Sequence, residues 1–312
     1  YLDGLAVDAA RAGDRLRAGQ RVGLWMDRPG SAAPADRRVA DLRRLLAVVH
    51  EDEALVVVDK PAGLLVEPRP GRAGEEVTVL DMVRDHVRHD TPARAYVVHR
   101  IDRNTSGLVL FARTLAARDA LKEQFEAHTP QRVYQAVLLG TPEPASGVWH
   151  DRLSWDSRAL RQHRAHGRQA GGKDARARYR VLEQFAAAAL VEVSLVTGRR
   201  NQIRVQAGLR GYPLLGEHQY RLEGPAEPAG LPTIGRQALH ACRLGFTHPA
   251  TGRKVTFRAP LPGDLAELLA ALRAGPAPAV APGGRRGAGG QQPAGGPRLR
   301  SARSAPTGER RG

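Results

Sequence analysis

The chain has 312 residues, of which 42% are hydrophobic and 26% charged, a balance that excludes a chain disordered throughout. Lys and Arg number 48 against 32 Asp and Glu, and the formal net charge of +16 favours a polyanionic partner, nucleic acid before an anionic membrane surface. The single cysteine, Cys242, excludes an intrachain disulfide and favours a reducing compartment. With no run of about 18 apolar residues and no secretory signal, we expect a cytoplasmic protein without a membrane span.

The first 46 residues precede the region with clear strand and helix patterns. Residues 1–27 contain short apolar runs around a Gly-containing turn, and they resemble the C-terminal half of an S4-type RNA-binding domain without the helices that normally precede it. An ordinary N-terminal hairpin is the alternative. Residues 28–46 are rich in Pro, Gly, Ala and Arg and predict a linker, with a short helical turn at residues 39–46.

Strand and helix patterns then follow in an irregular order. Apolar and β-branched runs predict strands at residues 48–53, 54–59, 96–98, 108–112, 132–140, 149–155, 177–184, 188–197, 239–246 and 254–259. Helical spacing predicts helices at residues 79–89, at 115–125 after a Thr114 cap and before Pro130, at a segment that ends near 209, and at 265–272. This order predicts an α+β fold with a mixed, largely antiparallel central sheet and flanking helices. Residues 156–176 predict an exposed loop, and residues 275–312, with almost no large apolar residue, a disordered basic tail.

A polar loop at residues 99–107 (HRIDRNTSG) lies between two predicted strands and carries a dense set of charged and hydrogen-bonding side chains. Its one carboxylate, Asp102, stands between Arg100 and Arg103 in the sequence. A carboxylate with cationic neighbours stays ionised and is available as a nucleophile or a base. The alternative is a polar turn whose charges face water.

Three other patterns carry less weight. Gly167, Gly172 and Lys173 have the spacing of a phosphate-binding loop, but Asp174 stands where such a loop has Ser or Thr. Ser106 lacks the Gly-x-Ser-x-Gly elbow of a hydrolase nucleophile. The eleven His show no ligand spacing with Cys or carboxylates, so we predict no metal site.

Four stretches in order carry a resemblance to one family: residues 57–63 (VVDKPAG), 99–107 (HRIDRNTSG), 132–137 (RVYQAV) and 197–205 (TGRRNQIRV). With them, the region of residues 47–272 resembles the RluA family of RNA pseudouridine synthases. The resemblance implies isomerisation of uridine in RNA, with 23S-type ribosomal RNA before transfer RNA as substrate, and no metal or organic cofactor. It also implies a pseudouridine synthase domain at residues 47–274 and a monomer without an obligate protein partner.

The resemblance implies roles for individual residues. The catalytic aspartate falls on Asp102, and the tyrosine that stacks on the base and assists proton removal falls on Tyr134. The basic residue that pairs with the aspartate falls on Arg204, with Arg199 as the competing assignment. Arg100 matches the arginine that enters the RNA stack when the target nucleotide leaves it. Further contacts with RNA are assigned to His99, Lys60, Arg199, Asn201 and Gln202.

The chemistry of these residue types agrees with the implied reaction. Uracil C5 and ribose C1′ are inaccessible inside a stacked helix, so the nucleotide has to be flipped out, and a planar guanidinium can fill the vacated space. A bidentate arginine would keep the Asp102 carboxylate ionised, and Tyr134 offers an apolar face with a hydroxyl at its edge. The alternatives are a core tyrosine for Tyr134 and a helix-surface arginine for Arg204.

The chain also departs from the family pattern. Asn201 and Gln206 stand where the family usually shows His, although neither is the catalytic position. A non-catalytic RNA-binding or ribosome-assembly factor is the main alternative function. A metal-dependent hydrolase is disfavoured because the sequence has no clustered carboxylates.

Overall fold

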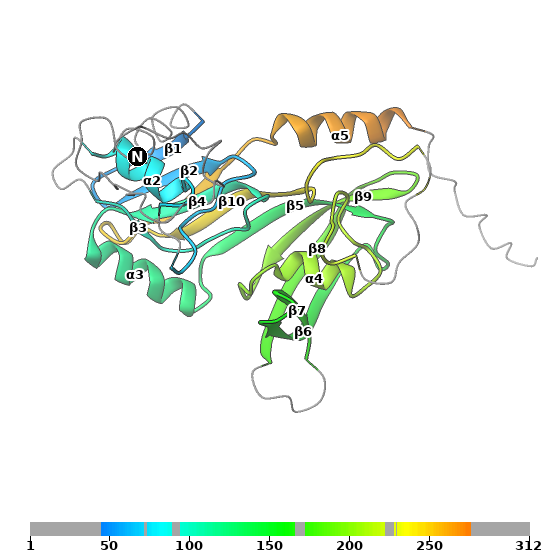
Figure 1. Ribbon diagram of the computed structural model, residues 1–312, viewed down its shortest axis with the longest axis horizontal. Coiled ribbons are helices and arrows are strands. Elements are labelled where there is room, and N and C mark those ends of the chain that lie inside the picture. Colours follow the sequence, from blue (N-terminus) through cyan, green and yellow to red (C-terminus); the bar gives the residue numbers. More distant parts are fainter. Residues whose placement is uncertain are drawn as a thin grey trace, which may run out of the picture. The chain divides into compact units, whose positions relative to one another are not determined.

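One mixed sheet of eleven strands organises the described part of the chain (Figure 1). The structure is a computed structural model that describes residues 45–71, 74–88, 94–165, 172–221, 228 and 230–275. The main path across the sheet runs β1-β2-β4-β10-β5-β9-β8-β6-β7, with β11 paired to β10 and β3 to β4. The strand bounds are β1 Ala47–Glu51, β2 Leu55–Lys60, β3 Tyr96–Val97, β4 Ser106–Ala112, β5 Gln131–Leu139, β6 Ser146–Asp156, β7 Arg161–Arg164, β8 Lys173–Gln184, β9 Ala188–Leu195, β10 Leu239–Thr247 and β11 Lys254–Arg258.

β4 and β10 are interior strands that run parallel, whereas the other strand pairs of the described residues are antiparallel. Ser106 aligns with His240, and Gly107 with Ala241. Gly107 has φ 112°, and a Cβ there would collide with the backbone of Ala241, so the position requires glycine. Because β4 begins at Ser106, the pairing fixes the polar loop before it beside the start of β10.

Four helices cover the described sheet: α2 Val79–His86, α3 Leu115–Glu126, α4 Gln202–Gly208 and α5 Gly263–Ala274. Polar caps start the first two, since the Thr78 side chain caps α2 and the Thr114 hydroxyl accepts the Ala117 N–H at 3.0 Å at the start of α3. Pro262 precedes α5 without a side-chain cap. The predicted α+β class with a mixed, largely antiparallel sheet is confirmed.

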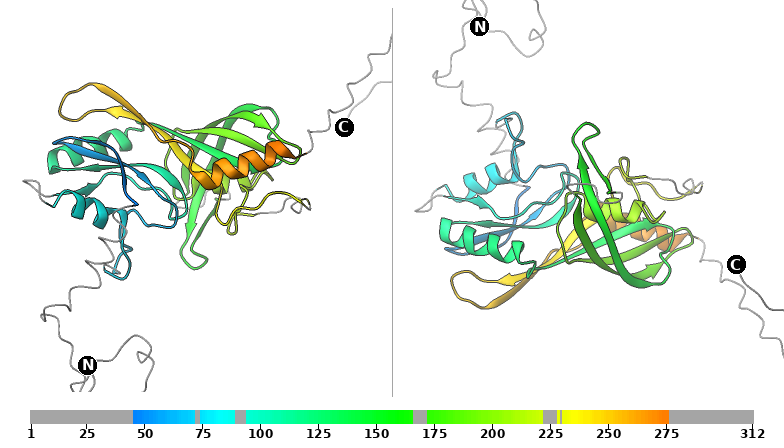
Figure 2. Two further views of the ribbon diagram at one scale, coloured as in Figure 1. Left: turned by 90° about the horizontal axis from the view of Figure 1, so that it is seen from above. Right: turned by 90° about the horizontal axis from the view of Figure 1, so that it is seen from below.

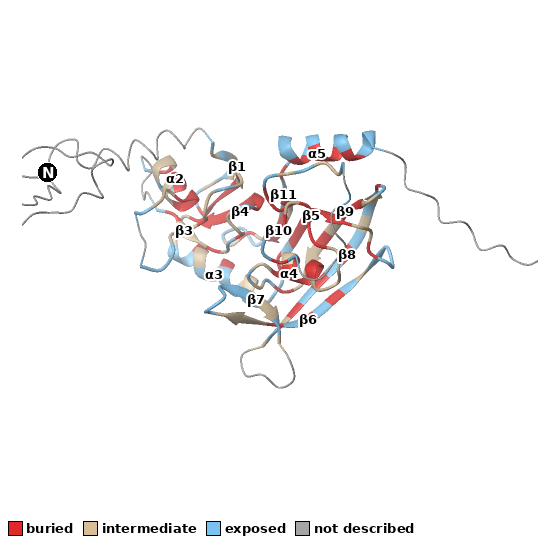
Figure 3. Ribbon diagram, turned by 45° about the vertical axis from the view of Figure 1, so that its right-hand side comes forward, coloured by how far each residue is buried: buried red, intermediate tan, exposed pale blue. Residues whose placement is uncertain are grey.

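The helices lie on alternating faces because successive strand residues point to opposite sides of the sheet. On β2, Val56 and Val58 pack in the cluster that includes α2, while Leu55 and Val57 pack with α3. Figure 2 accordingly shows α2 and α3 on either side of these strands. Figure 3 shows the resulting core, with buried residues along the strands and on the inward side of α5.

The same alternation on β5 places α4 and α5 on opposite faces. Tyr134, Ala136 and Leu138 share a cluster with α4, whereas Val137 and Leu139 share one with α5. Tyr134, a predicted site residue, therefore lies on the face of β5 that α4 covers.

The predicted loop at residues 156–176 is wrong over part of its length. β7 lies within it, and β8 starts at Lys173 rather than at residue 177. Ala175 and Ala177 are fully buried and alternate with exposed charged residues. Because alanine supplies little apolar volume, the strand pattern is weak in the sequence.

Several predicted segments fall outside the described residues. The S4-like segment at 1–27 and residues 28–44 of the predicted linker, including most of the helical turn at 39–46, belong to this group. So do residues 276–312 of the predicted tail.

Candidate active site

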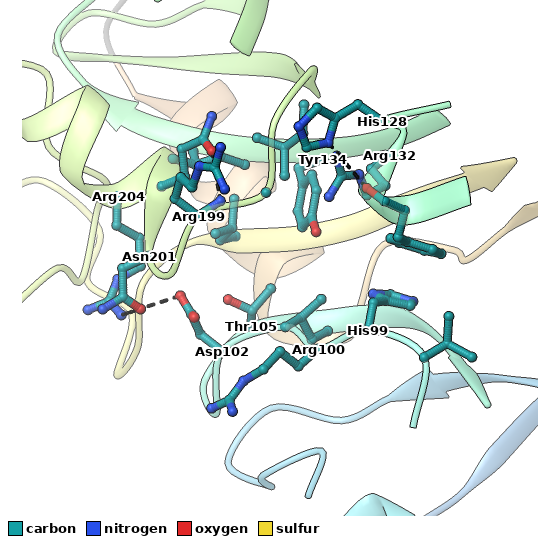
Figure 4. Close-up of a pocket in the computed structure, with 18 of the residues that line it drawn as sticks. His99, Arg100, Asp102, Thr105, His128, Arg132, Tyr134, Arg199, Asn201 and Arg204 are labelled. Atoms are coloured by element: carbon teal, nitrogen blue, oxygen red, sulfur yellow. Dashed lines mark hydrogen bonds and ion pairs between the residues drawn. The ribbon is translucent and has the colours of Figure 1, made fainter. Parts of the chain in front are cut away.

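The predicted catalytic residues line one cavity of about 430 Å³ (Figure 4). Asp102 comes from the loop before β4, Tyr134 from β5, and Arg199 and Arg204 from the turn into α4 and its first residues. The sheet order brings these segments together, since β4 and β5 both flank β10 and β9 lies beside β5. The end of α3 forms a further wall.

Lys60, at the end of β2, fixes the loop that carries Asp102. It has no exposed surface, and its ammonium donates to the backbone oxygens of Pro61 (2.8 Å), Leu64 (2.9 Å) and Arg103 (2.7 Å). Burial lowers the pKa of Lys60 to about 7, against the opposite effect of the Asp102 charge. All three donors of Lys60 are used inside the protein, and its contact with RNA stays a prediction.

Asp102 presents its carboxylate to the cavity, and 24% of the side chain is exposed. Its Oδ2 lies 3.5 Å from Nη1 of Arg204, a long contact. Burial raises the pKa of Asp102 above its usual value, while the charges of Arg204 and Arg100 act to lower it. The arginines therefore only partly offset the cost of holding this carboxylate ionised.

Arg204 is anchored by another carboxylate, that of Glu217. Its Nε and Nη2 donate to the two oxygens of Glu217 at 2.7 and 2.8 Å, and Nη1 also donates to Oδ1 of Asn201 at 3.1 Å. The expected bidentate pairing of an arginine with Asp102 is thus wrong in geometry, since Glu217 takes the bidentate position. Charge-assisted pairing lowers the pKa of Glu217 although its burial acts to raise it.

Tyr134 is 7% exposed, and its hydroxyl points toward the loop of Thr105 and Asp102 (Figure 4). Burial, reinforced by the negative charge of Asp102, raises the pKa of Tyr134 to about 12. At neutral pH the side chain is therefore a neutral phenol that can donate a hydrogen bond.

Arg100 is an exposed side chain on the same loop as Asp102. Its Nη1 lies 3.2 Å from Oε1 of Glu67, and 54% of the side chain is exposed. An exposed ion pair of this kind contributes little to stability, so the guanidinium can move from Glu67 to an RNA partner at low cost.

His99 has partners within the protein. Its Nε2 accepts the Leu110 N–H at 3.1 Å, which assigns the ring proton to Nδ1, and the ring stacks on Phe125 at 4.6 Å between centroids. Burial lowers the pKa of His99 to about 3, so the ring is neutral. Its contact with RNA stays a prediction.

Gln202 is 2% exposed and organises the turn before α4. Its Oε1 accepts from the Thr197 hydroxyl and the Arg199 N–H, both at 2.9 Å, and its Nε2 donates to the Arg176 carbonyl at 3.0 Å. Since both ends of the amide are occupied, Gln202 positions the turn, and its contact with RNA stays a prediction.

Asn201 and Arg199 lie at the cavity wall. Asn201 has φ 53° and connects Arg204 to Tyr220, whose hydroxyl receives the Asn201 Nδ2 hydrogen at 2.7 Å. Nε of Arg199 donates to the Asp174 carbonyl at 2.8 Å. Arg199 has no ion pair with Asp102 within the described residues, so the geometry favours Arg204 over Arg199 as the neighbour of the aspartate.

Two residues of the site were missed in the sequence. Glu217 lies outside the four stretches that carry the resemblance, and only the fold shows that it holds Arg204. Arg132 stands two residues before Tyr134 on the same strand, and residues at this spacing point to the same face of a sheet. This spacing could have identified Arg132 as a neighbour of Tyr134 from the sequence. It lines the cavity and is 8% exposed.

Among the described residues, no group of three or more His, Cys, Asp or Glu is placed to hold a metal ion. No helix within these residues is long and apolar enough to cross a membrane.

The fold defines the class of protein. A solved structure of human RNA pseudouridylate synthase domain containing 4 matches 78% of this chain and 98% of its own, with a TM-score of 0.63 and 22% identity. The human domain containing 1 protein matches 75% of this chain and 96% of its own, with a TM-score of 0.55 and 22% identity. The sheet and its helices thus have the fold of a pseudouridine synthase.

Sequence relatives then show the family. A protein named ribosomal large subunit pseudouridine synthase D from Pseudomonas aeruginosa is 39% identical over 237 residues, which cover 73% of this chain and 72% of the relative. Relatives of the same name from Neisseria meningitidis serogroup A and Nitrosomonas europaea are 35% and 37% identical, and the chain spans 69% and 65% of their lengths. Residues 54–208 match the RNA pseudouridylate synthase family. The chain belongs to this family, which confirms the resemblance found in the sequence.

Proposed function

We propose that this chain isomerises uridine to pseudouridine in RNA, with Asp102 as the catalytic carboxylate. The observation that carries the proposal is the position of Asp102 in a cavity of about 430 Å³, beside an Arg204 that Glu217 holds in place. The cavity is large enough for a nucleotide base and its sugar, and family membership supports the reaction class. A binding module would have no need for a carboxylate held at such a cost.

In the proposed reaction the target nucleotide leaves the RNA stack and enters the cavity. Arg100, exposed and only loosely paired with Glu67, fills the space that the nucleotide leaves. The bond from N1 of uracil to C1′ breaks, the base turns, and a bond from C5 to C1′ forms. The hydrogen on C5 is lost and N1 gains one, so substrate and product are isomers.

The residues divide this work by their chemistry. Ionised Asp102 acts on the ribose, either at C1′ or by removing a sugar proton. Arg204 stabilises the carboxylate from 3.5 Å without neutralising it fully, because Glu217 shares its charge. Tyr134 offers a flat face to the base, and its protonated hydroxyl orients a uracil oxygen or shuttles a proton without forming a phenolate.

The substrate that we propose is ribosomal RNA of the large subunit. Several relatives at 35–39% identity carry this substrate in their names. The basic charge of the chain suits an RNA of high charge density. We further propose a monomer whose catalytic domain is residues 47–274, acting in the cytoplasm where bacterial ribosomes are assembled.

Incubation of the protein with unmodified large-subunit ribosomal RNA and, separately, with transfer RNA tests the proposal. Pseudouridines are then mapped at single-nucleotide resolution. We expect new pseudouridine at one or a few positions of the ribosomal RNA. Modification of transfer RNA alone would contradict the substrate, and no pseudouridine in either RNA would contradict the function.

A further inference from the structure

Arg132 is a buried cation for which the described residues provide no counter-ion. It is 8% exposed, and the only hydrogen bond of its guanidinium to another described residue is from Nη2 to the Val196 carbonyl, a neutral acceptor at 3.3 Å. Nε is buried and has no hydrogen-bond partner in the described part of the chain. Arg132 forms no ion pair within the described residues, although the partly buried Arg204 and the buried Arg236 are paired with carboxylates.

The surroundings of Arg132 add positive rather than negative charge. Arg199 is close enough to act on it electrostatically, and Arg199 too lacks a carboxylate partner among the described residues. The aromatic face of Phe125, with its centroid 5.6 Å from the guanidinium carbon, offers only a weak cation–π contact. Lys122 and His128 lie at the rim with Glu126, which is exposed and not within ion-pair distance of Arg132.

The local structure makes room for this guanidinium. A Cβ at Gly198 would collide with Nη1 of Arg132, so the glycine of the TGRR motif leaves the space that Arg132 occupies. Figure 4 shows Arg132 beside Tyr134 and His128, across the cavity from Asp102 and Arg204. The cavity thus has a carboxylate at one end and an unneutralised cation at the other.

A buried charge without a partner is unfavourable, and a protein tolerates it where a ligand supplies the opposite charge. An arginine fork matches the geometry of phosphate oxygens. We propose that Arg132, assisted by Arg199, is the binding site for a phosphodiester group of the RNA next to the flipped uridine. The choice of RNA rests on the proposed function, but the presence of an anion site does not.

This assignment orients the substrate. A nucleotide has a neutral base, a sugar and an anionic phosphate, and the two ends of the cavity have opposite charge. With its phosphate at Arg132, the nucleotide extends past Tyr134 toward Asp102. Arg132 therefore acts as a positioning residue for the ribose on which Asp102 acts.

The first test needs no reaction. Thermal unfolding is followed while inorganic phosphate replaces chloride at constant ionic strength, for wild type, Arg132→Gln, Arg132→Lys and the control Arg178→Gln. Arg178 is an exposed arginine of β8 outside the cavity lining. We expect phosphate to raise the Tm of wild type and of the control, to raise that of the Lys variant less, and to leave Arg132→Gln unchanged. Equal shifts in wild type and Arg132→Gln would contradict the site.

The second test distinguishes an RNA linkage from free phosphate. Short RNAs that contain the mapped uridine carry a neutral methylphosphonate at one linkage at a time, and binding is measured for wild type and Arg132→Gln. We expect that neutralising one linkage next to the uridine weakens RNA binding by wild type about tenfold or more. The same substitution should leave RNA binding by Arg132→Gln unchanged. The negative slope of log affinity against log salt concentration should also become less steep in the variant, by about 0.7.

The two tests separate the possible failures. Phosphate binding without a sensitive linkage would contradict the assignment to RNA, because the site would then serve a free anion only. Arg132→Gln should also fold at least as stably as wild type without ligand, since it removes an unpaired buried charge. An active enzyme whose wild type binds no phosphate would contradict the anion site alone. A wild type that binds phosphate but forms no pseudouridine would contradict the proposed function alone.

Discussion

Asp102 is held in an environment that disfavours its ionised form, which its proposed chemistry requires. Burial raises its pKa, and Arg204 compensates only in part because Glu217 takes two of its donors. This environment lowers the free energy of unfolding only at pH values above the pKa of the carboxyl in the unfolded chain, about 3.9. Below that pH the carboxyl is protonated in both states and the cost is absent. Catalytic sites often hold groups at such a cost to stability.

Replacement of Asp102 by Asn should therefore stabilise the protein at neutral pH. The difference in unfolding free energy, variant minus wild type, should grow as pH rises from about 4 through the raised pKa of Asp102 and then level off. Urea unfolding of both proteins between pH 4 and 8 measures it, with Asp119→Asn as an exposed control. A variant less stable than wild type at pH 7 would contradict the account.

Glu217→Gln tests the anchoring of Arg204. The variant breaks a buried bidentate pair, and we expect a loss of about 3 kcal/mol, at the low end for such pairs because Asp102 remains nearby. Glu217 also raises the pKa of Asp102, so the acidic limb of the rate profile should shift to lower pH. The exposed Glu123→Gln serves as control, and an unshifted limb in Glu217→Gln would refute the coupling.

For individual residues, the sequence predicted which side chains line the cavity better than it predicted their hydrogen-bond and ion-pair partners. Asp102, Tyr134 and Arg204 were assigned from motifs, and all three line one cavity. That Arg204 pairs with Glu217, and that Lys60 is buried under the loop, depends on tertiary contacts that no local pattern reveals.

At the scale of elements, the parallel pair β4 and β10 determines where the catalytic loop lies. Its two strands begin 133 residues apart, at Ser106 and Leu239. Both strands were predicted from their apolar runs, but their pairing was not, because periodicity shows that a residue run is a strand and not which strand it joins. At residues 156–176, in contrast, strands themselves were missed. The alanines of β8 gave an apolar alternation too weak to predict a strand there.

Gly107→Ala tests the parallel pair. The new Cβ would meet the Ala241 backbone at a residue with φ 112°, and neither the contact nor the dihedral can relax through a side chain. We expect a loss of stability above about 3 kcal/mol, together with loss of activity. Gly252→Ala is the matched control, with φ 68° and no heavy atom near the new Cβ, and it should cost only about 1–2 kcal/mol. Equal effects of the two substitutions would contradict the packing argument.

At the scale of the whole molecule, the net charge of +16 is spread beyond the cavity. Residues 279–312 carry seven Arg and one Glu, so they add to the positive charge of the chain. The composition predicted a nucleic-acid partner from this charge, but the particular RNA is a matter of the sequence and shape around one uridine.

Removal of residues 279–312 should therefore weaken RNA binding at low salt and leave turnover at saturating RNA unchanged. Non-specific phosphate contacts depend steeply on salt, so the difference in affinity between full-length and truncated chains should shrink as salt rises. Binding isotherms at several salt concentrations measure this. A fall in turnover at saturating RNA would show that the segment takes part in the reaction.

The most direct test of the central claim is the formation of pseudouridine by wild type and Asp102→Asn on the same ribosomal RNA. Asn preserves the size of the side chain and removes the negative charge that the proposed reaction requires. We predict pseudouridine from wild type and from the Asp119→Asn control, and none above background from Asp102→Asn with RNA binding retained. Equal amounts of pseudouridine from wild type and Asp102→Asn would contradict the account.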